Sequence, residues 1–312
     1  IAAVLNSKGG FMAALDGLAK VSDPAVTDTP GIFASFFGPD PLNLLFVVIL
    51  TSLGTWGLPQ MVQKFYAIKD EKSIKKGTII STIFALVVAG GSYFLGGFGR
   101  LFSDEIDVAA NGYDSIIPTM LSNLSPLIIG ITLILVLSAS MSTLSSLVLT
   151  SSSTLTLDFI VPLSKKKDEK KTLIIIRAFI LVFIIISAVI AVIQYKNKIT
   201  FIAQLMGLSW GALAGSFLAP FLYSLYWKKV TKTACAVSFI WGIMIANMFF
   251  GSHFPTIIQS PVNCGAFAML ASLVIVPVVS LITRKPEKKF VDDIFSCYDR
   301  KVTVPVSEVL EE

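Results

Sequence analysis

Six long stretches without Asp, Glu, Lys or Arg are the feature that most constrains how this 312-residue chain can fold. They lie between Asp40 and Lys64, Lys76 and Arg100, Asp114 and Asp158, Arg177 and Lys196, Lys198 and Lys228, and Lys232 and Arg284. A helix needs about 20 apolar residues to cross a bilayer. The stretches therefore predict an all-α, polytopic membrane protein, built as a bundle of spanning helices.

The composition excludes several other classes of protein. Apolar residues make up 54% of the chain and charged residues 14%, whereas soluble domains carry about 25% charged residues. This excludes a disordered chain, a disulfide-framed secreted domain and an ordinary cytosolic enzyme. The three cysteines have no paired spacing and there is one histidine, so neither a disulfide framework nor a Cys/His metal site is indicated. We find no nucleophile–base set of a membrane enzyme, and we expect no enzyme activity and no nucleic-acid partner.

Two of the six stretches are too long for one helix. The 43 residues from Ser115 to Leu157 would form a helix of about 65 Å at about 1.5 Å per residue, and Pro126 predicts a break there. Gly251 to Pro261 supplies a break in the last stretch. We expect a short helix near Ile116–Leu124 and seven spans: Asn43–Lys64, Gly77–Arg100, one from about Pro126 towards Phe159, Ile174–Gln194, Phe201–Trp227, Thr233–Phe250 and Cys264–Thr283.

The distribution of Lys and Arg predicts the orientation of these spans. Four alternate segments, Lys64–Lys76, Lys165–Arg177, Lys228–Lys232 and the tail from Arg284, hold 20 of the 25 basic residues. Cytoplasmic loops carry an excess of Lys and Arg. We therefore expect a cytoplasmic C-terminus, an external N-terminal segment and a location in the cytoplasmic membrane.

The most unusual stretch runs from Ser138 to Ser146 and continues from Ser151 to Thr156 with many hydroxyl side chains. Moving a hydroxyl without a partner into hydrocarbon costs roughly 2–7 kcal/mol. One interpretation is close helix packing, since small residues let membrane helices approach. The other is a cation site: residues three and four positions apart share one helix face, and hard cations prefer oxygen ligands. The first carboxylate of this span is Asp158, at its cytoplasmic end.

A second candidate is the stretch from Thr51 to Gln60 in the first span. Gly54, Gly57 and Pro59 weaken or kink a helix, and interrupted helices expose backbone groups where transporters bind their solutes. The alternative is a kinked packing helix with an interfacial tryptophan. A third stretch, Leu208–Pro220, is rich in small residues and indicates a packing helix.

Together these stretches resemble the sodium:solute symporter family. The matching pieces are Trp56–Phe65, Ala139–Ser146 continuing to Asp158, Trp210–Gly215, and Pro220 with Tyr226–Lys229. The resemblance implies a core of two inverted five-helix repeats followed by further helices. This chain would hold the second repeat and two C-terminal helices. The first repeat would lie upstream of Ile1, and we expect the chain to be a fragment.

The expected division of the chain follows from this resemblance. Residues 1–42 would be the end of a preceding helix and an external loop, and residues 43–227 the five-span second repeat. Residues 228–283 would form two additional transmembrane helices, and residues 284–312 a cytoplasmic tail.

The resemblance also implies roles for single residues on the hydroxyl-rich span. The carbonyl of Ala139 and the hydroxyls of Ser142 and Thr143 match half of a sodium site shared across the family, whose other half comes from an unwound helix of the missing repeat. Ser145 and Ser146, together with Ser142, match a second sodium site of some members. That second site also needs an aspartate from the first repeat.

In the broken first span, Ser52, Thr55 and Trp56 fall where family members contact their substrate. The expected function is sodium-coupled symport of a small organic solute, an amino acid such as proline or a carboxylate or vitamin. Sodium would be the coupling ion, and no organic cofactor is expected. The expected partners are the solute, sodium, the lipid bilayer and the missing N-terminal repeat of the same protein.

Two other classes of membrane protein share this kind of helical bundle. One is another secondary carrier with a similar inverted-repeat fold, coupled to protons; such carriers usually need a membrane-embedded Asp, Glu or His, and the middle of these spans holds none. The other is a membrane sensor joined to a signalling kinase, for which the tail from Arg284, 29 residues long, is too short.

Overall fold

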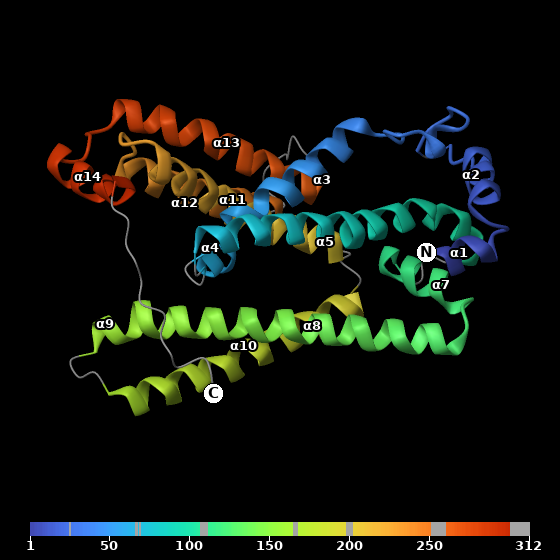
Figure 1. Ribbon diagram of the computed structural model, residues 1–312, viewed down its shortest axis with the longest axis horizontal. Coiled ribbons are helices and arrows are strands. Elements are labelled where there is room, and N and C mark those ends of the chain that lie inside the picture. The colour runs from blue at the N-terminus through green and yellow to red at the C-terminus, as the bar shows by residue number, and fades with distance from the viewer. Residues whose placement is uncertain are drawn as a thin grey trace. The chain divides into compact units, whose positions relative to one another are not determined.

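The computed structural model describes residues 1–24, 26–65, 68, 70–106, 112–164, 168–197, 202–250 and 260–299. They belong to two compact units. Unit 1 contains Ile1–Ala34 and Gly91–Phe201, and unit 2 contains Ser35–Gly90 and Ile202–Glu312. The described residues form helices and no sheet, apart from one isolated bridge between Asp23 and Thr27 (Figure 1). This confirms the all-α prediction.

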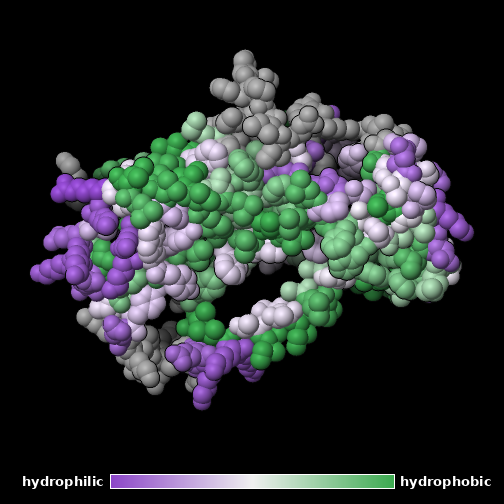
Figure 2. All heavy atoms as spheres, turned by 90° about the horizontal axis from the view of Figure 1, so that it is seen from above, coloured by the Kyte–Doolittle hydropathy of each residue, from purple (hydrophilic) through white to green (hydrophobic). Residues whose placement is uncertain are grey.

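Five of the seven predicted spans are helices long and apolar enough to cross a membrane. They are α5 (Glu71–Gly97) continued by η3 (Phe98–Glu105), α8 (Pro126–Thr154) continued by η5 (Leu155–Ile160) and α9 (Val161–Leu163), α10 (Glu169–Asn197), α11 (Ile202–Tyr226) and α13 (Pro261–Ile282). The other two are shorter apolar helices, Pro41–Gly57 and Lys232–Met244. The first comprises α3 (Pro41–Leu53) and η2 (Gly54–Gly57), and the second is part of α12 (Lys232–Phe250). On the face in view in Figure 2, hydrophobic side chains cover much of the helices.

The predicted break before Pro126 is confirmed. Helix α7 (Ile116–Ser122) ends four residues earlier, and α8 begins with Pro126 in its first turn after Ser125 in an extended conformation. Proline disfavours helical backbone in the residue before it and is well placed at a helix start, where its missing N–H is not needed. The predicted break between Gly251 and Pro261 falls mostly outside the described residues, and α13 again begins with a proline, Pro261.

In unit 1, α8 and η5 pack against α10. The buried polar residues of α8 and η5 are Ser152 and Thr156, both 0% exposed. The Ser152 hydroxyl donates to the Val148 carbonyl at 2.7 Å, and the Thr156 hydroxyl donates to the Ser152 carbonyl at 2.8 Å. These bonds satisfy hydroxyls that would otherwise cost free energy in an apolar interior. The packing interpretation of the hydroxyl-rich stretch therefore holds for this part of it.

Unit 1 also contains a small apolar core built from short segments. It combines α1 (Ala2–Ser7), α2 (Phe11–Lys20), η3 and α7, with η1 (Ile32–Ala34) packed on α2. We call it the loop core; its buried members are Val4, Leu5, Ala14, Leu18, Phe98, Phe102 and Met120. From the sequence we expected the end of a preceding helix and an external loop over residues 1–42, a short helix near Ile116–Leu124 and the end of a span at Arg100, with no contacts between them. In the structure these segments bury apolar side chains against one another.

In unit 2, α11, α12 and α13 pack side by side (Figure 1). Gly211 of α11 lies directly against Gly265 of α13: a Cβ on Gly211 would collide with the Gly265 backbone, and a Cβ on Gly265 would collide with the Gly207 carbonyl. On the α12 side, the Ser238 hydroxyl lies 3.2 Å from the carbonyls of Gly215 and Ser216. Small residues and interhelical hydroxyl bonds of this kind are typical of membrane helix pairs, which confirms the packing interpretation of the Leu208–Pro220 stretch.

Two short helices complete the described part of unit 2. Helix α4 (Pro59–Phe65) follows η2, and α14 (Lys288–Phe295) follows α13 and continues into η6 (Ser296–Asp299). In unit 1, η4 (Tyr113–Ser115) leads into α7.

Candidate functional site

The first span is interrupted rather than merely kinked. Helix α3 starts at Pro41, with the Asp40 carboxylate accepting a hydrogen bond from the Asn43 N–H at 3.0 Å. It gives way to the 3₁₀ turn η2, and Leu58 is extended before α4 begins. The sequence prediction of an interruption at Gly54, Gly57 and Pro59 is thus confirmed. A 3₁₀ stretch inside an apolar helix exposes backbone groups that a continuous helix would use.

The glycines let this interruption lie directly against α11. A Cβ on Gly57 would stand 2.9 Å from the Ala214 Cα and the Leu218 Cβ, so that only glycine allows this contact without a shift. Ala214, Leu218 and Met269 form a buried cluster there, with Ile49 of α3 packed on it. The interruption is therefore fixed to the pair α11 and α13.

The three predicted substrate residues lie together at this interruption. Ser52 is exposed, Thr55 is partly buried, and the Trp56 side chain is 57% exposed. The Thr55 hydroxyl donates to the Ser52 carbonyl at 3.2 Å. The buried glycines on one side of η2 and the exposed indole on the other give the turn one packed side and one uncovered side. That uncovered side offers hydroxyl groups and an amphipathic ring.

The predicted sodium residues all lie on the middle of α8, whose regular α-helix puts Ala139, Ser142, Thr143 and Ser146 on one face. We call these four residues the hydroxyl face. Each of them is exposed. Among the described residues, none forms a hydrogen bond with the hydroxyl of Ser142, Thr143 or Ser146. Their surroundings thus differ from those of Ser152 and Thr156, which are buried on the same helix.

The remaining predicted residue, Ser145, is also exposed. Its hydroxyl donates to the Met141 carbonyl at 2.8 Å and so is already satisfied within the helix. The hydroxyls of Ser142 and Thr143 and the carbonyl of Ala139 are hard oxygen donors, the type that alkali and alkaline-earth cations prefer. The hydroxyl face lies in unit 1 and the interrupted span in unit 2, so their meeting stays a prediction.

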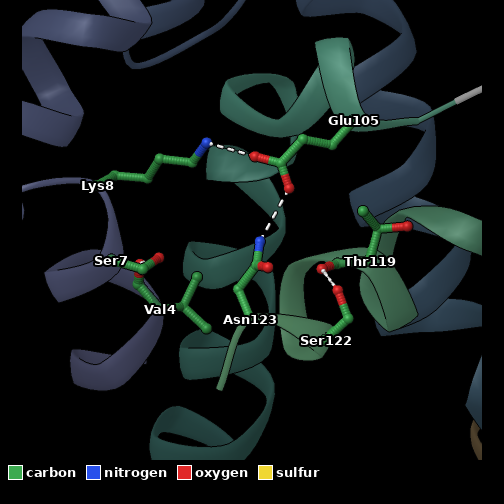
Figure 3. A network of polar contacts seen from close by, with 7 residues as sticks. All are labelled: Val4, Ser7, Lys8, Glu105, Thr119, Ser122 and Asn123. Atoms are coloured by element: carbon green, nitrogen blue, oxygen red, sulfur yellow. Dashed lines mark hydrogen bonds and ion pairs between the residues drawn. The ribbon is translucent and has the colours of Figure 1, made fainter. Parts of the chain in front are cut away.

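A polar network on the loop core was not predicted from the sequence. Lys8 forms an ion pair with Glu105 at 3.0 Å, and the Asn123 side-chain amide donates to the other Glu105 oxygen at 2.9 Å (Figure 3). Nearby, Arg100 pairs with Asp23 at 2.7 Å. Lys8 and Arg100 are two of the five basic residues that lie outside the predicted cytoplasmic loops. Their position on the predicted external side was the feature of the sequence that could have indicated a special role for them.

A family model described as the sodium:solute symporter family matches residues 2–245. The chain is 28% identical over 262 residues to the osmoregulated proline transporter OpuE of Bacillus subtilis, covering 83% of this chain and 52% of that protein. A sodium/proline symporter of Staphylococcus aureus is 28% identical over 266 residues, with 80% and 51% covered.

A third relative is the sodium/pantothenate symporter of Haemophilus influenzae, which is 28% identical over 242 residues, covering 75% of this chain and 47% of that protein. The chain spans about half the length of the curated relatives it matches.

Proposed function

The chain belongs to the sodium:solute symporter family, and on this premise we propose that it forms part of a carrier that couples sodium entry to the uptake of a small organic solute. The observation that carries the proposal is the hydroxyl face of α8. Three hydroxyls sit there on an apolar spanning helix, exposed and without a hydrogen-bond partner among the described residues. Such groups cost free energy in an apolar environment unless something else binds them.

We propose that this partner is sodium. The Ala139 carbonyl and the Ser142 and Thr143 hydroxyls would supply half of its ligands, and an unwound helix of a preceding repeat would supply the rest. Ser145 and Ser146 would take part in a second site only if that repeat provides an aspartate, because neutral oxygens alone bind a cation weakly.

The solute site would lie on the uncovered side of η2. Ser52 and Thr55 offer hydroxyls for the polar groups of the solute, and Trp56 offers a ring face for its apolar part. The solute is a small organic molecule such as proline, or a carboxylate or vitamin; relatives named as proline and pantothenate symporters support this range. Gly57 contributes to the proposed solute site indirectly, because its contact with α11 holds the packed side of η2 in place.

Coupling would follow from a shift between two conformations. Sodium bound between α8 and the preceding repeat would favour the state open to the outside, and the solute would then bind beside Trp56. Rocking of one repeat against the other would expose both to the cytoplasm. In this arrangement the C-terminus lies in the cytoplasm. The excess of Lys and Arg in the alternate loops supports this orientation.

The test is sodium dependence of uptake in the full-length carrier. Ser142→Ala and Thr143→Ala each remove one proposed ligand, and each is expected to raise the sodium concentration for half-maximal uptake about tenfold, the effect of about 1.4 kcal/mol. Ser151→Ala is the matched control. It removes an exposed hydroxyl nine residues further along, on the opposite side of the helix from Ser142, and should leave the sodium dependence unchanged.

Two results would contradict the proposal. One is the same sodium dependence in Ser142→Ala, Thr143→Ala and the parent protein. The other is uptake that follows a proton gradient and ignores sodium, which would favour the proton-coupled alternative.

A further inference from the structure

We propose that α14 is a membrane-surface anchor: its Phe290 and Ile294 side chains insert into the leaflet next to the end of α13, and the basic residues around it bind anionic lipid headgroups. The inference does not depend on which solute the carrier moves. It rests on the position, contacts and charges of α14.

Helix α14 lies close to the end of a spanning helix. Helix α13 ends at Ile282, and α14 begins at Lys288 after a short connection. Figure 1 shows α14 beside the ends of α12 and α13. Because α13 has the length and composition of a spanning helix, its end lies near the lipid headgroups, and α14 cannot be far from them.

The sequence of α14 separates apolar from polar residues around the helix. Phe290 and Ile294 are one turn apart, and Val291 and Phe295 extend the same apolar side. Its four charged residues occupy the other side: Lys288, Lys289, Asp292 and Asp293. A short helix with one apolar and one charged side is the type that lies in the membrane interface.

Contacts with the end of α11 hold α14 in place. The Lys228 ammonium pairs with the Asp292 carboxylate at 2.9 Å and lies 5.4 Å from the centre of the Phe295 ring. The Tyr298 hydroxyl donates to the Leu225 carbonyl at 2.8 Å. The contact with Lys228 lies at the Phe295 edge of the apolar side of α14 and partly covers that edge.

The other edge of the apolar side is left uncovered. Phe290 is 61% exposed and Ile294 is 52% exposed. These two side chains are far fewer than a stable protein–protein interface needs, since each partner usually contributes about 800 Å². A bilayer needs no such area, because α13 already holds α14 at the membrane and insertion is effectively intramolecular.

The charge around α14 fits an anionic surface. The connection and first turn of α14 carry four exposed basic residues, and the turn after α11 and the start of α12 add one each: Arg284, Lys285, Lys288, Lys289, Lys229 and Lys232. The acidic residues of this segment are Glu287, Asp292, Asp293 and Asp299, of which Asp292 is paired with Lys228. Basic segments next to a span attract anionic lipids. The occupant that suits both the apolar edge and this charge is an anionic lipid leaflet.

The experiment measures water access to single cysteines in the purified full-length carrier, with Cys235, Cys264 and Cys297 replaced by alanine. Ile294→Cys tests the apolar edge and Asp293→Cys, one residue away on the charged side, is the matched control. Both are reacted with a water-soluble maleimide in nanodiscs of phosphatidylcholine, with or without about one third phosphatidylglycerol. We expect Ile294→Cys to react at least tenfold more slowly than Asp293→Cys in the anionic nanodiscs, and the protection to shrink in the neutral ones.

A second variant tests the headgroup contacts. Replacing Arg284, Lys285, Lys288 and Lys289 by glutamine should remove the difference between anionic and neutral nanodiscs. Equal reaction rates of the two cysteines in anionic nanodiscs would overturn the proposal. Protection that appears only in native membranes, and not in nanodiscs of the purified carrier, would assign the apolar edge to another protein and would overturn it as well.

Discussion

The absence of one Cβ, at Gly57, determines how closely the interrupted span approaches α11. The Ala214 Cα and the Leu218 Cβ lie 2.9 Å from the position a Cβ would take. Both belong to a buried part of a rigid helix, so neither can move away cheaply. At the scale of single residues, the turn that carries Ser52, Thr55 and Trp56 is therefore positioned from its packed side.

Gly57→Ala tests this positioning. We expect it to destabilise the protein by roughly 1–3 kcal/mol, the usual effect of inserting a methyl group into a packed site, and to lower the midpoint of thermal unfolding in detergent. Gly77→Ala is the control, since a Cβ at Gly77 has no atom within 4 Å and alanine favours helix over glycine. An equal loss of stability in both variants would argue against the close contact.

We also expect the contact between Asp292 of α14 and Lys228 to depend on pH. The hydrogen bond and charge of Lys228 lower the pKa of Asp292 below its usual value of 3.8. A lowered pKa means that the contact is fully present above that value and is lost as pH falls through the lowered pKa. Hydrogen exchange of the α14 amides, corrected for intrinsic rates, should therefore speed up at acidic pH.

Two variants make that measurement specific. Lys228→Gln should show weak protection of α14 at every pH, because the ion pair is gone. Asp293→Asn removes the neighbouring carboxylate, which does not pair with Lys228, and should keep the pH dependence of the parent protein. A flat pH profile in the parent would show that Asp292 contributes nothing to docking.

Helices α11 and α13 pack through glycines that differ in how little space they leave for a side chain. A Cβ on Gly211 would collide with the Gly265 backbone, whereas one on Gly215 would stand 3.2 Å from the Ala268 Cβ. We expect Gly211→Ala to lower the yield of folded protein severely and Gly215→Ala to lower the unfolding midpoint only slightly. Size-exclusion profiles and thermal unfolding of the purified variants check this order, and the reverse order would contradict it.

The sequence predicted the helices better than their contacts. Pro126, Gly54, Gly57 and Pro59 act on their own backbone, so the breaks they cause could be found from spacing alone. The loop core could not, because Val4, Phe102 and Met120 come from segments far apart in the chain and each segment alone is short.

The candidate site shows the same division between local and long-range effects. Helical spacing placed Ser142 and Thr143 on one face, as the structure confirms. Spacing alone could not tell which hydroxyls on α8 are buried and which stay uncovered, since Ser152 belongs to the same run of hydroxyl residues as Ser142. Burial separates them, and burial depends on tertiary contacts that the spacing of one helix does not contain.

At the scale of the whole molecule, the proposed orientation can be tested with the cysteines the chain already has. Cys297 is exposed, whereas Cys235 and Cys264 are partly buried. We expect a membrane-impermeant maleimide to label Cys297 only after the cells are permeabilised, because the C-terminus is proposed to be cytoplasmic.

The matched control for this experiment is Asp16→Cys, at an exposed position on α2, in a protein in which Cys235, Cys264 and Cys297 are replaced by alanine. It should be labelled in intact cells, since α2 is proposed to lie outside. Labelling of Cys297 in intact cells would reverse the orientation.

The loop core has a practical consequence for recombinant production. Its buried side chains come from α1 and α2 as well as from η3 and α7. Trimming the chain to start at the first span would leave Phe98, Phe102 and Met120 without their covering residues, and uncovered aromatic and thioether side chains of this kind promote aggregation. Residues 1–20 should therefore be kept in any shortened version made for purification.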